Sequence, residues 1–117
     1  ALSHPVGALH DTHHGMTNAV FMPYVLQFNR NTIETKIKRL AAYIGLTPDF
    51  DAFLKWVLEL RAELHVPHTL KDFGVGKENF ALMAKMAPDD PTAGGNPVPL
   101  TEKDAHDLFE TAYSGTL

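Results

Sequence analysis

Apolar residues recur at helical spacing in two successive stretches in the middle of the chain. In residues 32–45 and again in residues 50–64, they return every three or four positions, while charged residues take the other faces. Such a stripe predicts an amphipathic α-helix. Gly45 is the expected end of the first helix, Pro48 suits the first turn of the second, and Pro67 is expected to follow its end. The stripes are Ile33, Ile37, Leu40, Ala41 and Ile44 in the first helix and Phe50, Phe53, Leu54, Val57, Leu60 and Leu64 in the second.

Residues 15–29 are almost continuously apolar, as expected for a helix that is buried on every side. Pro23 lies inside this stretch and predicts a kink between Ala19 and Pro23. The Val, Phe and Tyr residues of the stretch would also suit a strand, so the pattern leaves that alternative open. The length of the stretch and its Asn18-Ala19 start favour a helix.

Shorter elements are predicted on either side of these three helices. Residues 2–9 have the pattern of a short helix, and the loop Asp11-Thr12-His13 follows it. Asp11 or Thr12 is the candidate N-cap of the next helix, because short polar side chains accept a bond from the first free amides. Further along, Thr69 and Asp72 predict a capped turn that ends at Gly74.

The last third of the chain predicts two more helices separated by a loop. Residues 77–86 form the first, with Phe80, Leu82, Met83 and Met86 inward, and residues 88–99 are a loop with four prolines. Thr101 and Asp104 form a capping box that opens the last helix. No stretch makes a convincing strand, so we expect one all-α domain over residues 1–117, a bundle of about six helices.

Composition narrows the classes of function. A chain of 117 residues is enough for one core, and 44% hydrophobic with 21% charged residues is ordinary for a globular protein. The net charge of -4 and pI near 5.9 argue against a nucleic-acid partner, which would favour a basic face. No apolar run approaches the roughly 20 residues that cross a bilayer. The absence of Cys excludes disulfides and thiolate metal sites, and we expect a cytoplasmic protein with no membrane partner.

Four of the seven histidines lie within eleven residues, from His4 to His14. Imidazole binds transition metals and moves protons near neutral pH. His14 directly precedes Gly15 and the long apolar stretch, so we expect it at a helix N-terminus, where packing would hold a ligand rigidly. On the residues alone, an imidazole that bonds a backbone carbonyl at the helix end is the more common role for His14 than a metal ligand. The three remaining histidines, interpreted as surface residues, are His65, His68 and His106.

The histidine-rich stretch resembles the signature of the iron-containing (group III) alcohol dehydrogenases. That signature has a His followed by a turn of small residues, then Pro-His-Gly or a similar triplet that opens a helix beginning with Asn-Ala. The matching segments are His4-Pro5-Val6-Gly7-Ala8, His13-His14-Gly15, Asn18-Ala19-Val20, Met22-Pro23-Tyr24-Val25, Phe28-Asn29 and Gly95-Asn96-Pro97-Val98-Pro99-Leu100-Thr101. They follow the order of the family and cover both ends of the chain.

The resemblance implies the helical C-terminal domain, of the dehydroquinate synthase-like type, of an enzyme that transfers hydride between NAD or NADP and an alcohol or aldehyde. It makes His14 a ligand of Fe²⁺ or Zn²⁺, which acts as a Lewis acid, and places His4 in the proton relay or the substrate-orienting group. It puts the other three protein ligands ahead of Ala1, with the N-terminal domain that would bind the dinucleotide. We therefore expect this chain to need its own N-terminal domain as partner and to be inactive alone. Homo-oligomerisation stays open.

Two histidines depart from the family pattern. His13 stands where Pro is frequent, and His10 where a bulky, often aromatic residue is usual and could face the substrate pocket. The alternative to the enzyme is a free-standing helical metal-binding or protein-interaction module, in which His10, His13 and His14 form a site of their own and Asp11 adds an oxygen ligand. Adjacent residues such as His13 and His14 rarely point at one ion, which weighs against this alternative.

Overall fold

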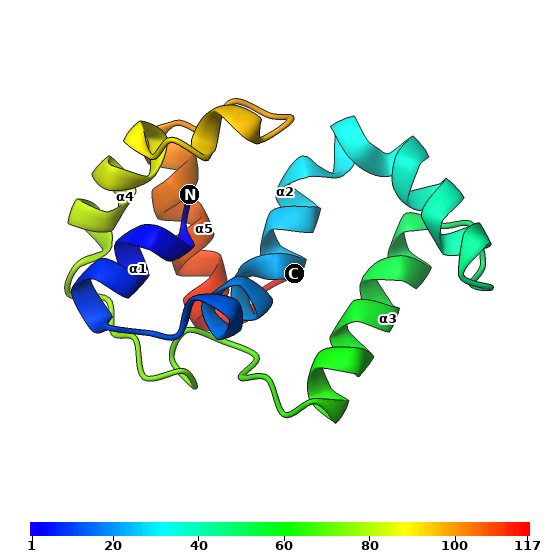
Figure 1. Cartoon of the computed structure of the whole chain (residues 1–117), viewed down its shortest axis with the longest axis horizontal. Coiled ribbons are helices and arrows are strands. Elements are labelled where there is room, and N and C mark those ends of the chain that lie inside the picture. Colours follow the sequence, from blue (N-terminus) through cyan, green and yellow to red (C-terminus); the bar gives the residue numbers. More distant parts are fainter.

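The computed structural model describes all 117 residues and contains five α-helices, one 3₁₀ turn and no strand. The prediction of an all-α fold is confirmed. The elements are α1 (Ser3–His10), α2 (His14–Tyr43), α3 (Phe50–Glu63), α4 (Phe80–Asp89), η1 (Ala93–Gly95) and α5 (Glu102–Ser114). Figure 1 shows α1, α4 and α5 gathered on one side of α2, with α3 on the other. None of the five α-helices combines the length and the apolar character that a membrane span requires.

One helix, α2, runs without interruption for 30 residues. The prediction of two helices, at residues 15–29 and 32–45, was wrong on this point. The intervening Arg30 and Asn31 are polar but contain no Gly or Pro, and their helix propensities are close enough to average for the helix to continue. Pro23 is tolerated inside α2, where it is buried. Figure 1 shows α2 turning toward α3 in its second half.

His13 caps the start of α2. The prediction that Asp11 or Thr12 would do so was wrong. The ring Nδ1 of His13 accepts from the amide of Met16 at 3.4 Å. Asp11 instead ends α1 in the left-handed conformation, with φ of 52°, and its amide donates to Gly7. Asp is one of the few residues that visits this conformation readily, so it serves the end of one helix and not the start of the next.

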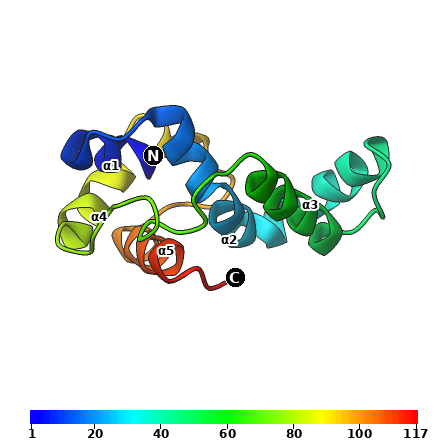
Figure 2. The ribbon, with the colours of Figure 1, turned by 90° about the horizontal axis from the view of Figure 1, so that it is seen from below.

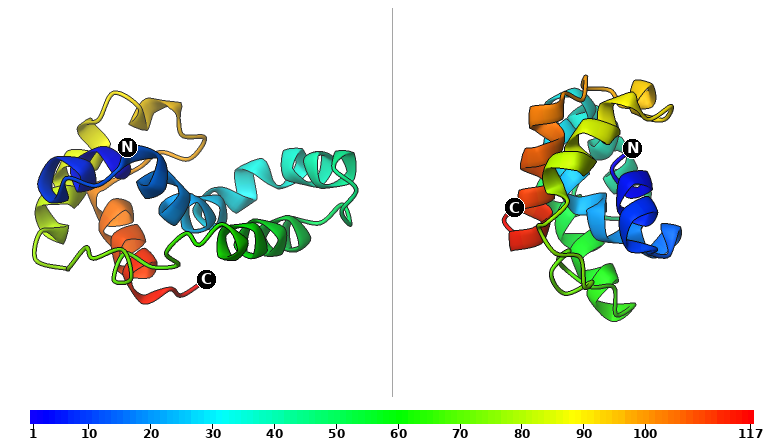
Figure 3. Two further views of the ribbon diagram at one scale, coloured as in Figure 1. Left: turned by 60° about the horizontal axis from the view of Figure 1, so that its bottom comes forward. Right: turned by 90° about the vertical axis from the view of Figure 1, so that its left-hand side faces the viewer.

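The helices enclose two separate cores. The larger one lies between α1, the first half of α2, α4, α5 and the segment 70–75, and the smaller one lies between the second half of α2 and α3. Among the helices, α3 packs only against α2. Figure 2 and the left view of Figure 3 show that the second half of α2 and α3 extend together from the rest of the molecule as a two-helix arm.

The two-helix arm explains why several predicted core residues are exposed. Leu40 on α2 and Leu60 on α3 belong to the predicted stripes but lie at the surface. So do Ile44 and Leu64, which directly follow these two helices, and Leu64 is 64% exposed. A helix that packs against a single partner buries only the narrow face that meets it. The buried residues of the arm are Ile37, Ala41, Phe50, Phe53, Leu54 and Val57.

Helix α4 is shifted by three residues from the predicted 77–86. Its buried positions are Phe80, Met83, Ala84 and Ala87, which follow the helical i, i+3, i+4, i+7 pattern. Leu82 lies off that face and is 50% exposed, so its predicted inward position was wrong. Two of the predicted end signals were right. The Thr101 and Asp104 capping box is present at α5, and the Asp72 amide donates to Thr69 Oγ1 at 3.0 Å in the turn that ends at Gly74.

Candidate functional site

The structure brings His4 and His14 together as a stacked pair. His4 lies in the first turn of α1 and His14 is the first residue of α2, and only three residues separate the two helices. The chain reversal places the two imidazole rings 5.0 Å apart between centroids, with an angle of 15° between their planes. Both residues are exposed, so two parallel imidazoles are available to ligands from outside the chain.

Asp90 binds His4 from the opposite end of the sequence. Its Oδ2 lies 2.6 Å from Nδ1 of His4, at the point where α4 ends. The side chain of Asp90 is only 9% exposed, whereas that of His4 is 48% exposed. The carboxylate is therefore the fixed member of this pair and the imidazole is the accessible one.

Thr92 holds the other carboxylate oxygen of Asp90. The Thr92 hydroxyl donates to Asp90 Oδ1 at 2.5 Å and the Thr92 amide donates to it at 2.8 Å. The Thr92 hydroxyl has the largest effect on the pKa of Asp90 and lowers it, and the bonds from the Thr92 amide and His4 act in the same direction. Burial raises this pKa but by less than the three bonds lower it, so the pKa lies well below its usual range. Asp90 is thus an anion at neutral pH.

His14 and its neighbour His13 have different partners. Nε2 of His14 lies 3.2 Å from the Asn18 amide nitrogen one turn further along α2, which makes Nε2 the acceptor of that bond. His13 is occupied with the Met16 amide. The two adjacent imidazoles therefore bond to different groups. His14 stands at the helix N-terminus, as predicted.

The remaining histidines do not join this pair. His10 ends α1, and its Nε2 is buried without a hydrogen-bond partner. No group of three or more His, Cys, Asp or Glu side chains is arranged to hold a metal ion, so the predicted alternative site of His10, His13, His14 and Asp11 does not form. His65 and His68 are exposed, and His106 is half-buried against the Phe80 ring.

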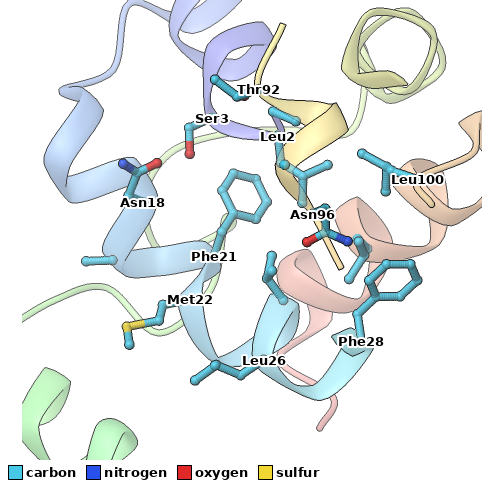
Figure 4. Close-up of a pocket in the computed structure, with 15 residues that line it drawn as sticks. Leu2, Ser3, Asn18, Phe21, Met22, Leu26, Phe28, Thr92, Asn96 and Leu100 are labelled. Atoms are coloured by element: carbon cyan, nitrogen blue, oxygen red, sulfur yellow. The ribbon is translucent and has the colours of Figure 1, made fainter. Parts of the chain in front are cut away.

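An apolar groove of about 580 Å³ opens between the start of α1, the middle of α2 and the loop after α4. The Phe21 ring projects into it and Asn96 lies on the opposite wall (Figure 4). Thr92, the residue that holds Asp90, also lines this groove. The apolar wall is formed mainly by Leu2, Phe21, Met22, Val25, Leu26, Phe28 and Leu100.

The predicted loop at residues 88–99 begins two residues later than expected, because α4 includes Pro88 and Asp89. Asn96 fixes the segment after α4 to α2 through a reciprocal amide pair with Asn29. Asn29 Nδ2 donates to Asn96 Oδ1 at 2.8 Å, and Asn96 Nδ2 donates to Asn29 Oδ1 at 2.9 Å. Asn96 Nδ2 also donates to the Val98 carbonyl at 2.6 Å. The loop that carries Asp90 and Thr92 is therefore anchored to the helix that carries His14.

The donor set of this chain fits one metal ligand rather than a whole metal site. Transition-metal sites in proteins generally use three or four protein ligands. The site here offers His14, whose Nε2 accepts one bond from Asn18, and the neighbouring His4. His4 Nδ1 is already engaged by Asp90. A metal held by His14 would need its other ligands from outside these 117 residues.

Comparison with known proteins defines the class. Residues 1–113 match the family model described as "Fe-containing alcohol dehydrogenase family, C-terminal". The chain belongs to this family. It is 32% identical over 119 residues to lactaldehyde reductase of Escherichia coli and 30% identical over 125 residues to an NADPH-dependent butanol dehydrogenase of Clostridium saccharobutylicum, covering 96% and 99% of this chain.

Solved structures agree with the family and the fold. A 1,3-propanediol oxidoreductase superposes with a TM-score of 0.88 at 28% identity, and an alcohol dehydrogenase from Oenococcus oeni with a TM-score of 0.83 at 31% identity, each over 96% of this chain. The chain spans 31% of each of these two proteins, and 31% and 32% of the two relatives above. The predicted C-terminal helical domain of an iron-containing alcohol dehydrogenase is confirmed at the level of family and fold.

Asp90 was missed by the sequence reasoning. It lies 86 residues from His4, in a loop that offered no periodicity or motif linking it to the histidines. The Asp89-Asp90 pair could have been singled out only as a cluster of carboxylates close to the matched Gly95–Thr101 segment.

Proposed function

We propose that this chain is the metal-site-bearing C-terminal part of a metal-dependent alcohol dehydrogenase that uses NAD or NADP. The observation that carries the proposal is the stacking of His4 on His14, the two residues to which the resemblance assigns the family's histidine roles, with Asp90 bonded to His4. The relatives are named for an aldehyde and an alcohol, lactaldehyde and butanol. A small alcohol or aldehyde is accordingly the proposed substrate class.

In this proposal His14 contributes one ligand to Fe²⁺ or Zn²⁺, and three more come from the preceding part of the protein. When bound, the metal supplies a Lewis acid for the substrate oxygen. His4, whose ring stacks on that of His14 at 5.0 Å between centroids, is the group that accepts the hydroxyl proton when an alcohol is oxidised and returns a proton when an aldehyde is reduced, directly or through a water. The dinucleotide is bound mainly by the N-terminal domain, so this chain alone is inactive.

The apolar groove is the proposed contact surface for the preceding part of the same protein. The relatives are roughly three times as long as the segment they share with this chain, and the matched segment is their C-terminal part. Ala1 and Leu2 line the groove themselves, so chain that precedes Ala1 would start at its edge. Met22 is exposed at this groove, and covering it would also close the side of α2 that carries Asn18 and His14.

The test is His14→Ala in the full-length protein, with His13→Ala as the matched control. Loss of one protein ligand should lower metal affinity by at least the 10- to 100-fold that is typical of losing an outer-shell partner, and turnover with it. Dinucleotide affinity should change little. His13→Ala removes only a weak cap and should keep metal content and activity. Metal per subunit and alcohol oxidation rate are measured for both; full occupancy and activity in His14→Ala would refute the assignment.

A further inference from the structure

The contact between Asp90 and His4 specifies which imidazole nitrogen carries the proton. Asp90 is ionised and therefore has only acceptor atoms. Its Oδ1 receives two donors from Thr92, which leaves Oδ2 for Nδ1 of His4 at 2.6 Å. Nδ1 must then be the protonated nitrogen of His4, and in the neutral ring the lone pair is left on Nε2.

The second nitrogen of His4 is free within this chain. Nδ1 is the only ring atom of His4 with a hydrogen-bond partner, while the side chain is 48% exposed and its ring face lies against His14. The stack limits how far the ring can tilt, and the bond to Asp90 limits its rotation. The ring is thereby restrained in both orientation and tautomer.

We propose that Asp90 is a positioning residue, which holds His4 in the Nδ1–H tautomer and thereby keeps Nε2 as the proton-accepting atom beside the metal ligand. Thr92 serves the same end by occupying Oδ1, so that Oδ2 alone faces the ring. The value of this arrangement for a proton relay rests on the proposed function. The tautomer itself is a property of these 117 residues, and it can be measured without metal, cofactor or turnover.

Replacement of Asp90 by Asn is expected to exchange the protonation states of the two ring nitrogens of His4. The Thr92 amide can only donate, so the Asn carbonyl oxygen should face Thr92 and its NH₂ group should face His4. A donor at that position requires Nδ1 to accept, which forces His4 into the Nε2–H tautomer. Asp90→Asn should therefore invert the tautomer, whereas Asp89→Asn, at an exposed neighbour outside the contact, should not.

The experiment is long-range ¹H–¹⁵N correlation NMR of the ¹⁵N-labelled chain at about pH 8.5, roughly two units above the ordinary imidazole pKa. The His4 signals are assigned by their loss in His4→Gln. The parent and Asp89→Asn should show a protonated-type shift at Nδ1 and an unprotonated-type shift at Nε2, and Asp90→Asn should exchange the two. Two results would overturn the proposal. The first is an Nε2–H tautomer in the parent chain, a measurement that does not depend on any variant folding. The second is an unchanged tautomer in an Asp90→Asn chain that is shown to be folded.

Discussion

Replacement of Asn96 by Leu should destabilise the fold well beyond the loss of one surface contact. Leu has nearly the shape of Asn but offers neither donor nor acceptor. The variant loses the two bonds of the reciprocal pair with Asn29 and the bond to the Val98 carbonyl. Asn29 is only 5% exposed, so its amide is left without partners in a largely dry environment.

The magnitude follows from the groups that are left unpaired. A buried polar group that loses its partner costs about 1–3 kcal/mol, and Asn29 has one donor and one acceptor in the pair. Asn96 lines an open groove, so water can reach part of the vacated space and satisfy the Val98 carbonyl. We expect Asn96→Leu to lower the free energy of unfolding by about 2–3 kcal/mol, against a total of about 5–15 kcal/mol for a domain of ordinary stability.

Urea denaturation followed by circular dichroism at the helix bands measures this loss, which should appear as a midpoint lower by roughly 1–2 M. Asn29→Leu should cost a similar amount. The double variant should cost less than the sum of the two by about 1–3 kcal/mol, because it leaves no unpaired amide. The reasoning would be refuted if the two single-variant losses in free energy of unfolding summed to the loss of the double variant within about 0.5 kcal/mol. That result would show that the two amides do not interact.

Two further predictions concern the capping box and the lowered pKa of Asp90. Thr101→Ala should cost about 1 kcal/mol in the same assay, since the Asp104 amide loses its acceptor at the start of α5; a midpoint equal to that of the parent would contradict this. The lowered pKa of Asp90 means that its carboxylate stabilises the fold above the ordinary carboxyl value of about 3.9 and that this contribution fades as the pH falls through the lowered value. Asp90→Asn should therefore lower the urea midpoint near pH 6, and the difference in midpoint between this variant and the parent should shrink steadily below about pH 4. Asp89→Asn should match the parent at both pH values. A difference in midpoint that grows in acid would show that the predicted direction of the pH dependence is wrong.

Local signals in the sequence were sufficient for most helix ends. The cap at Thr101, the positive-φ glycines Gly45 and Gly74 and the apolar spacing of residues 50–57 each depend on residues a few positions apart. The same locality placed His14 at a helix start. The wrong predictions had two causes, which were a choice between two local roles for Asp11 and a contact with a distant helix for Leu82. Asp11 ended α1 instead of starting α2, and Leu82 lost its place in the core because α5 meets the Phe80–Ala87 face of α4.

The candidate site was predictable only in part. The family resemblance assigned roles to His4 and His14, and their stacking follows from a short connection that reverses the chain. The spacing of ten residues alone does not give a ring-to-ring contact. Asp90 could not be found in this way, because its pairing with His4 depends on how the end of α4 meets α1 in three dimensions.

The length of α2 has a consequence for how the molecule opens. The first half of this helix belongs to the larger core, and the second half shares the six-residue core of the arm with α3. A unit with so little buried surface can open on its own, while the larger core stays closed. Backbone amides of α3 and of the Ile37–Ala41 region should therefore exchange with solvent deuterium through local opening, at rates set by the arm alone. Amides around Val20 to Tyr24 should exchange only through global unfolding, so protection would change along a single uninterrupted helix.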